Sequence, residues 1–260
     1  WCRVKVAGKY GKKYIWCMVN KEAKVAVYFY DDGSRGRKVL RDFLGETKID
    51  ALQSDGFNVY MYLDKELVDV DHLCCLAHAR AKFKYAQEQG KDADAEYFIS
   101  NIGRLYDLEE QYRLRNLTAQ QIQQERQGKQ TSKIIQKIRL RLDKLLADTS
   151  GMRGELMNKA LNYLKSFWNQ LILYVKDGRY SIDNSLAERT LRPMTVERKN
   201  SLTFGSHDGA EVSVIYHTFI ETCKMCGVST LEYFKEFFKA IMQGRTDYEN
   251  MLPMTIGIKK

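Results

Sequence analysis

Short apolar runs near the start of the chain predict β-strands. Residues 14–19 and 25–30 are rich in aromatic and β-branched side chains and flank the turn-like segment 20–22, so we predict an antiparallel pair. Residues 31–34, with the sequence Asp-Asp-Gly-Ser, end the second run and can cap a helix through residues 38–44. The chain is therefore expected to open with a hairpin and a helix.

Two more apolar runs and a basic helix follow. Residues 49–53 resemble a short buried strand ended by Ser54-Asp55-Gly56, and residues 70–76 precede the basic helix. Strands that alternate with helices predict an α/β core. The basic helix carries His78, Arg80, Lys82 and Lys84.

From about residue 92 to residue 176 the strand pattern gives way to helical periodicity. Thr118 and Gln121 have the spacing of a capping box. The Gln- and Arg-rich stretch 120–130 fits a solvated helix or a helix that faces DNA, and the solvated interpretation is favoured. We therefore predict a helical module between two α/β parts. Its apolar residues form three stripes: Ile102, Leu105, Tyr106 and Tyr112; Ile134, Ile135, Ile138, Leu142, Leu145 and Leu146; Leu161, Leu164, Trp168, Leu171 and Ile172.

The remainder of the chain returns to a mixed pattern. A helix through residues 185–193 is followed by an extended piece at 201–204 and a glycine-flanked loop at 205–209. A strongly apolar helix is expected over residues 210–226, and a last helix begins after a capping box at 229–232.

The composition and net charge indicate which kinds of molecule the protein binds. The chain has 260 residues, enough to bury a sizeable core, and an ordinary apolar fraction of 44%. Its net charge of +9 favours anionic partners, nucleic acid first and acidic membrane surfaces second. The sequence has no run of about 18 apolar residues and no apolar signal region, so we expect a cytoplasmic protein whose six cysteines are reduced core thiols.

Two acidic residues occupy positions suited to metal-dependent chemistry. Asp55 follows a predicted strand, where α/β proteins place catalytic groups, although Asp-Gly is also a common turn. Glu188 can bind a metal, or it can complete a capping box with Ser185 and reach back to the start of the helix. The residues by themselves leave both alternatives open.

Basic residues follow Glu188. Arg189 and Arg192 come one and four positions later, so Arg192 shares a helical face with Glu188 and can neutralise a phosphate. Arg198 and Lys199 are suited to contacts with a DNA backbone. An arginine beside a glutamate can also form no more than an ion pair.

Histidine and cysteine residues raise the question of zinc. His78 lies in a Cys-x-x-His motif and fits either a functional or a structural histidine. Cys75 and His78, together with Cys223 and Cys226, have the ligand count of a zinc site. Because Cys223 and Cys226 fall on a strongly apolar helix, we favour buried thiols instead.

Several motifs in a fixed order resemble transposases of the insertion sequence 66 family, and the resemblance covers roughly residues 14–238. It implies an α/β fold with a ribonuclease H-like core, which is a mixed sheet flanked by helices, and a large all-α insertion. It also implies a DDE acidic triad, a divalent metal (Mg²⁺ or Mn²⁺) and DNA as the substrate. The motifs are Leu52-Gln53-Ser54-Asp55-Gly56-Phe57, Cys75-Leu76-Ala77-His78-Ala79-Arg80-Ala81-Lys82-Phe83, Ile182-Asp183-Asn184-Ser185-Leu186-Ala187-Glu188-Arg189-Thr190-Leu191-Arg192-Pro193, Arg198-Lys199-Asn200 and Phe204-Gly205-Ser206.

The resemblance assigns roles to the two acids. Asp55 matches the second acid of the triad and Glu188 the third, so both are expected to be catalytic metal ligands. The first acid belongs to an Asp-Glu-Thr motif that is expected just before Trp1, outside this sequence. Asp31 and Asp32 follow a later strand in a turn context and are poor substitutes.

The resemblance also divides the chain and supplies partners. The core is expected in two parts, residues 1–90 and 177–243, separated by the helical insertion 91–176 and followed by a tail, 244–260. The expected partners are double-stranded DNA, as element terminal repeats and as target, and further copies of the chain on DNA, with no membrane. In a bacterium the protein would be associated with the nucleoid when on DNA. The expected DNA-binding residues are Arg189, Arg192, Arg198, Lys199, Arg80, Lys82 and His78.

The expected function is therefore metal-dependent DNA cleavage and strand transfer during transposition. The alternative is a catalytically inactive DNA-binding or assembly protein derived from such an enzyme. Two acids satisfy the octahedral coordination of Mg²⁺ poorly without a third, so this sequence is expected to bind DNA but to cleave it little. DNA nicking in Mg²⁺ that disappears in a Glu188→Gln variant would contradict that expectation.

Overall fold

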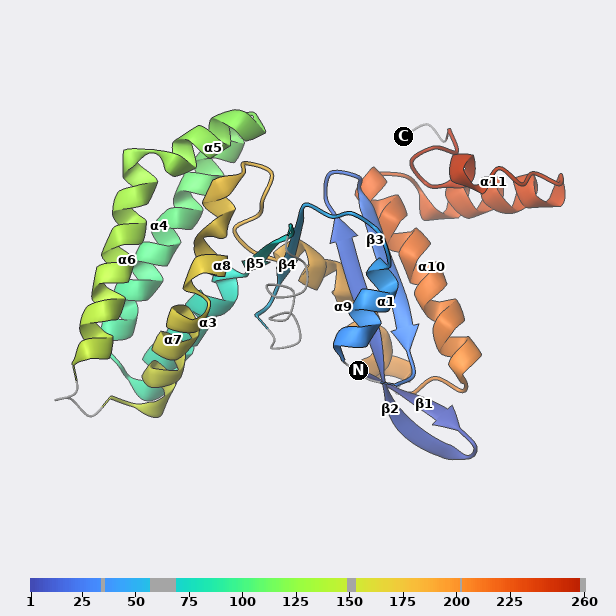
Figure 1. The fold of residues 1–260 in the computed structure, drawn as a ribbon. Coiled ribbons are helices and arrows are strands. Elements are labelled where there is room, and N and C mark those ends of the chain that lie inside the picture. The colour runs from blue at the N-terminus through green and yellow to red at the C-terminus, as the bar shows by residue number, and fades with distance from the viewer. Residues whose placement is uncertain (34–35, 57–68, 149–152, 202, 258–260) are drawn as a thin grey trace. The chain divides into compact units, whose positions relative to one another are not determined.

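The computed structural model describes residues 1–260 except 34–35, 57–68, 149–152, 202 and 258–260. The chain divides into two compact units (Figure 1). The first unit contains both ends of the chain, and the second is one continuous segment. Their bounds are Trp1–Phe43 with Ser185–Lys260, and Leu44–Asn184.

The first unit is built on a three-stranded antiparallel sheet. Its strands are β1 (Cys2–Val6), β2 (Lys9–Asn20) and β3 (Val25–Asp31), in that spatial order. Alternate residues of β3, Ala26 and Tyr28, are buried, as the period of a strand requires. The predicted antiparallel pair is confirmed.

Helix α10 packs along β3, which is an edge strand of the sheet, and its side chains form hydrogen bonds with the free edge of that strand (Figure 1). The Ala26 N–H donates to Thr222 Oγ1 at 3.2 Å and the Tyr28 N–H donates to Thr218 Oγ1 at 2.9 Å. The Thr222 hydroxyl also donates to the Ala26 carbonyl at 3.1 Å. These bonds satisfy backbone groups that an edge strand would otherwise expose. The helices of this unit are α1 (Arg37–Leu44), α9 (Ser185–Ser201), α10 (His207–Cys226), α11 (Thr230–Met242) and the 3₁₀ turn η3 (Tyr248–Met251).

Helix α10 begins earlier than predicted. The loop expected at residues 205–209 is wrong for its second half, because the helix starts at His207. Ser206 is the N-cap, and its Oγ accepts the Gly209 N–H at 3.0 Å. The flanking glycines indicated a loop, so this cap was not predicted. The cap provides an acceptor for a backbone N–H in the first turn of the helix. In α11, Ser229 Oγ likewise accepts a hydrogen bond from the backbone of Glu232 at 3.4 Å.

The extended piece predicted at 201–204 is wrong at Ser201, which is the last residue of α9, and is present at Phe204. The Phe204 N–H donates to the Arg3 carbonyl at 2.8 Å and the Lys5 N–H donates to the Phe204 carbonyl at 2.9 Å, forming a parallel bridge opposite Val4. Residue 202 of that piece, and Ser34 of the predicted cap before α1, lie outside the described residues.

The second unit combines a small parallel sheet with a helical module. Strands β4 (Ala51–Ser54) and β5 (Asp71–Cys74) pair in parallel. The strand predicted at 49–53 is confirmed from Ala51 onward, whereas Ile49 and Asp50 precede it; its burial is overestimated, because residues 51–53 are only partly buried. The helices are α3 (Leu76–Gly90), α4 (Asp94–Leu114), α5 (Ala119–Gln127), α6 (Lys129–Ala147), α7 (Glu155–Ser166), α8 (Trp168–Ile172) and the 3₁₀ turn η2 (Leu173–Lys176).

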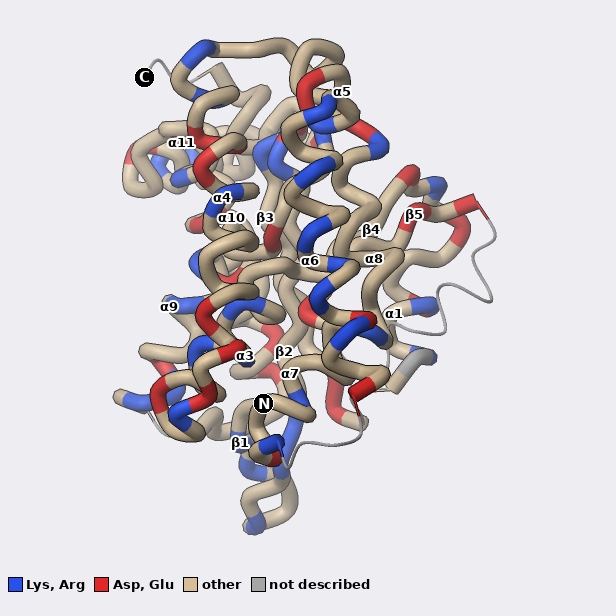
Figure 2. The backbone as a smooth tube through the Cα atoms, turned by 90° about the vertical axis from the view of Figure 1, so that its left-hand side faces the viewer, with Lys and Arg blue, Asp and Glu red and all other residues tan. Residues whose placement is uncertain are grey.

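The apolar stripes predicted for the helical module form one core. Ile102, Ile138 and Leu161, one from each stripe, are fully or almost fully buried in a single cluster. The capping box of Thr118 and Gln121 is present at the start of α5. Lys and Arg recur along α6 outside its apolar stripe (Figure 2). An amphipathic helix buries one face and leaves the other in water, so these charges need no buried partners.

The structure confirms the mixed α/β class. The strands described form two separate small sheets, so a ribonuclease H-like core and the boundaries 1–90, 91–176, 177–243 and 244–260 stay proposals.

Candidate functional site

Asp55 lies in a tight turn at the carboxyl end of β4. Ser54 Oγ accepts the Gly56 N–H at 3.3 Å and lies 2.9 Å from Nε2 of the buried His72. Gly56 has a φ of +77°, a conformation that glycine adopts without steric cost. Tyr163 Oη donates to the Asp55 carbonyl at 2.9 Å. Asp55 thus occupies both the predicted turn and the predicted strand end.

A second aspartate lies at the same end of this sheet. The Leu76 N–H, just after β5, donates to the Ile182 carbonyl at 3.2 Å. Because β4 and β5 are parallel, their carboxyl ends share one edge, and this bond brings Asp183 to the edge that carries Asp55. Burial raises the pKa of Tyr106, and the negative charge of Asp183 raises it further. Asp183 was not among the predicted site residues, although it lies directly before the predicted acidic helix.

The predicted basic residues of α3 have different surroundings. Lys82 Nζ lies 4.8 Å from the centroid of the Tyr163 ring. Arg80 Nε donates to the Ile99 carbonyl of α4 at 3.4 Å, so part of this guanidinium is used in helix packing. His78 is partly buried. Of these predicted DNA contacts, Lys82 is therefore the one that lies beside Tyr163, whose hydroxyl is bonded to the Asp55 carbonyl.

In the first unit, Glu188 is exposed in the first turn of α9. The Tyr28 hydroxyl donates to the Thr190 carbonyl, and Thr190 Oγ1 donates to the Leu186 carbonyl at 2.8 Å. Burial raises the pKa of Tyr28, so its hydroxyl stays protonated and keeps this bond. Strand β3 therefore holds the turn of α9 that carries Glu188. Ser185 is the first residue of the helix, and a helix N-terminus favours a carboxylate whether that group caps or binds a metal.

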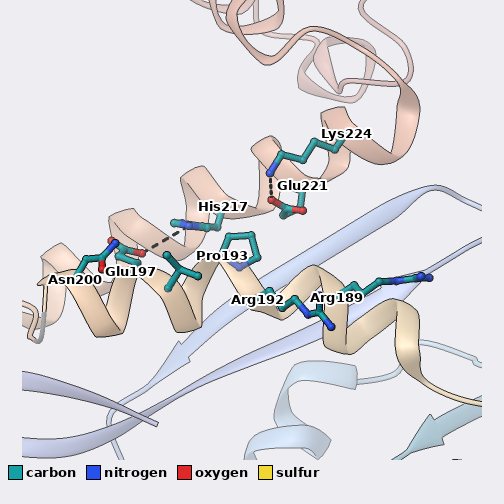
Figure 3. A pocket seen from close by; sticks show the side chains of 9 residues that line it. Arg189, Arg192, Pro193, Glu197, Asn200, His217, Glu221 and Lys224 are labelled. Atoms are coloured by element: carbon teal, nitrogen blue, oxygen red, sulfur yellow. Dashed lines mark hydrogen bonds and ion pairs between the residues drawn. The ribbon is translucent and has the colours of Figure 1, made fainter. Parts of the chain in front are cut away.

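Helices α9 and α10 border an open groove of about 720 Å³ next to this turn (Figure 3). Three cationic side chains line it, Arg189, Arg192 and Lys224, together with the acids Glu197 and Glu221. The Lys224 ammonium pairs with Glu221. Arg189 and Arg192 are both exposed and add positive charge beyond that pair.

The other acid of the groove is also engaged. Glu197 accepts hydrogen bonds from Ser213 Oγ at 3.3 Å and lies 3.6 Å from Nε2 of His217. His217 Nδ1 is 3.0 Å from the Ser213 carbonyl, which can only accept, so Nδ1 carries a proton. With both acids matched to partners, the groove can accommodate an anion beside the two arginines.

The end of α9 contacts the N-terminus of the chain. Arg198 Nη1 donates to the Trp1 carbonyl at 3.3 Å, and its guanidinium carbon lies 4.8 Å from the centroid of the indole ring. Lys199 is exposed. Arg198 therefore has a structural role within the first unit, whereas Lys199 faces solvent.

The cysteines of α10 are core thiols. Cys223 and Cys226 are buried, and Cys226 Sγ lies 3.6 Å from the Lys24 carbonyl. Burial raises the pKa of Cys223 to about 11, which disfavours the thiolate that a zinc ligand requires. These observations agree with the buried-thiol interpretation. Among the residues described, no helix is long and apolar enough to cross a bilayer.

Three proteins of Sinorhizobium fredii (strain NBRC 101917 / NGR234) are similar to the chain. Uncharacterized protein y4qI is 28% identical over 95% of this chain and 47% of its own length. Uncharacterized protein y4jD is 24% identical over 87% of this chain and 44% of its own length. Uncharacterized protein y4hP is 28% identical over 77% of this chain and 38% of its own length. The chain thus spans less than half the length of these relatives.

No solved structure matches the chain. Residues 2–212 match the family described as "Transposase IS66 family". This match covers most of the first unit and all of the second, including the Asp55 turn, α3 and α9. The chain belongs to the IS66 family of transposases.

Proposed function

We propose that the chain contributes the catalytic part of a DDE transposase, in which Asp55 and Glu188 are two of the carboxylates that bind Mg²⁺ or Mn²⁺. The family match carries this proposal. Two structural features support it: Asp55 follows a β-strand, and Glu188 lies in the first turn of a helix that continues with Arg189 and Arg192. Strand ends and helix N-termini are frequent locations for groups that act on phosphates.

The donor atoms of both residues suit the proposed metal. Mg²⁺ and Mn²⁺ prefer hard oxygen ligands, and each residue offers a carboxylate. Asp55 is partly exposed and Glu188 is exposed, so an ion from solvent can reach either side chain. When bound, such metals activate the attacking oxygen and stabilise the leaving oxygen in phosphodiester displacement.

The protein's own residues would position the DNA. Arg189 and Arg192 can bind phosphate oxygens at the groove beside α9, and Lys199 and Lys82 can add further backbone contacts. These contacts carry no sequence information. We therefore propose double-stranded DNA as the substrate, with the terminal repeats and the target both bound by copies of the chain.

A nicking assay tests the proposal. The chain is incubated in Mg²⁺ or Mn²⁺ with supercoiled plasmid that carries the repeats flanking its gene. The sequence alone predicted little cleavage by two acids. If the two acids nevertheless suffice, metal-dependent nicking appears and falls at least about a hundredfold in Asp55→Asn and in Glu188→Gln. Asp50→Asn and Glu211→Gln remove exposed carboxylates elsewhere in the same two units and should change little.

Three outcomes separate the possibilities. Nicking that persists in both site variants contradicts the assigned residues. DNA binding that weakens steeply with salt but is never followed by nicking supports the alternative, an inactive DNA-binding protein. Failure to bind DNA contradicts both functions.

A further inference from the structure

Tyr163 joins the helical module to the turn that carries Asp55. It lies on α7, between the fully buried Leu161 and Leu164, so its backbone is held firmly in the core of the second unit. Its ring packs against Phe167 with 4.8 Å between centroids. From there its hydroxyl donates to the Asp55 carbonyl at 2.9 Å.

The turn accommodates this contact because residue 56 is glycine. A Cβ atom at Gly56 would lie 2.7 Å from Tyr163 Oη, closer than real Cβ contacts allow. The φ of +77° at Gly56 also disfavours any other residue. Because residue 56 has no side chain, the backbone can adopt the conformation of the turn and Tyr163 can approach it closely.

The same ring also contacts a cation. Lys82 Nζ, on α3, lies 4.8 Å from the ring centroid, within the range of a cation–π interaction. A tyrosine hydroxyl is protonated at neutral pH, so it donates this hydrogen bond and the ring carries no charge.

We propose that Tyr163 is a positioning residue for the transposase site. Its hydroxyl fixes the backbone turn that orients the Asp55 carboxylate for a divalent metal, and its ring holds Lys82 for a DNA phosphate. The inference rests on the proposed function, because it takes Asp55 to be a metal ligand. It gives the helical module, which carries none of the predicted acids, a direct part in the site.

Manganese binding tests the first half of this inference. Free Mn²⁺ is measured by electron paramagnetic resonance during titration of the purified chain. Tyr163→Phe keeps the ring and removes the hydroxyl, and it should weaken Mn²⁺ binding about tenfold. Tyr112→Phe is the matched control, because Tyr112 is buried in the same module and its hydroxyl lies 3.4 Å from Thr131 Oγ1 of α6.

DNA binding tests the second half. Fluorescence anisotropy without metal reports contacts to the phosphate backbone. Tyr163→Phe should bind DNA like the wild type, whereas Tyr163→Leu and Lys82→Gln should each weaken binding about two- to threefold. Lys84→Gln, which removes an exposed charge from the same helix, is the control and should bind more tightly than Lys82→Gln.

The outcomes distinguish the inference from the proposed function. If Asp55→Asn abolishes Mn²⁺ binding and Tyr163→Phe leaves it unchanged, the positioning role is wrong and the proposed function stands. If Asp55→Asn binds Mn²⁺ like the wild type, Asp55 is not a ligand and the proposed function fails for that residue. A Tyr163→Leu variant with wild-type DNA affinity refutes the role of the ring.

Discussion

A buried arginine holds the segment that leads from the helical module back to the acidic helix. Arg126 is 3% exposed, and all five of its N–H groups have partners. Two donate to the Glu109 carboxylate at 2.6 and 2.8 Å. The others donate to the carbonyls of Tyr174, Asp177 and Tyr180 at 2.7–3.0 Å.

Replacing Arg126 with Met should destabilise the second unit strongly. The variant leaves Glu109 and three backbone carbonyls without their donors, and loss of one partner from a buried ion pair costs about 3–5 kcal/mol. At about 2–4 °C per kcal/mol, the melting temperature should fall by about 6–20 °C. Differential scanning calorimetry and urea unfolding followed by circular dichroism measure the change.

Two further variants make the reasoning refutable. Arg113→Met removes an exposed arginine that pairs with Glu110 through two hydrogen bonds, and it should leave the melting temperature almost unchanged. The double variant Arg126→Met with Glu109→Leu should recover part of the loss, because it no longer leaves a partly buried carboxylate unpaired. If Arg126→Met melts at the same temperature as Arg113→Met, the Arg126–Glu109 pair stabilises the protein no more than the exposed Arg113–Glu110 pair, and the predicted effect of burial is wrong.

Two other predictions concern the Asp55 turn and the thiols. Gly56→Ala should lower the free energy of unfolding by about 1–3 kcal/mol in urea titration, because its φ is +77° and the new Cβ meets Tyr163; an unchanged midpoint would refute this. Burial raises the pKa of Cys17 to about 12 and that of Cys223 to about 11, so at about pH 8 very little thiolate is present. Iodoacetamide should therefore alkylate both thiols far more slowly in the native protein than in denaturing urea, as mass spectrometry can quantify, and equal rates would contradict the raised pKa of these thiols.

Local patterns predicted local structure well. The β2–β3 pair, the basic helix α3 and the stripe with Ile138 follow from the period of apolar residues, which depends only on neighbours in the sequence. The turn at Asp55 followed from Asp-Gly chemistry for the same reason. These features did not require knowledge of which segments meet in space.

Long-range partners could not be predicted in this way. The stretch 120–130 is polar and was expected to be solvated, yet Arg126 within it is buried, because the carbonyls of Tyr174 and Tyr180 supply partners that no local pattern reveals. The contact between Tyr163 and Asp55 joins residues from different ends of the second unit and left no local signal. Only the order of several motifs gave the family.

The central proposal is that Asp55 and Glu188 are both ligands of the catalytic metal, and Mn²⁺ affinity tests it most directly. The measurement compares the wild type with Asp55→Asn, Glu188→Gln and the double variant in the presence of DNA. If both carboxylates bind the same metal, each single change should weaken Mn²⁺ binding severely, and the double change should cost much less than the sum of the two losses. If Glu188→Gln binds Mn²⁺ like the wild type, or if the two losses add fully, the residues do not share a site and the account is contradicted.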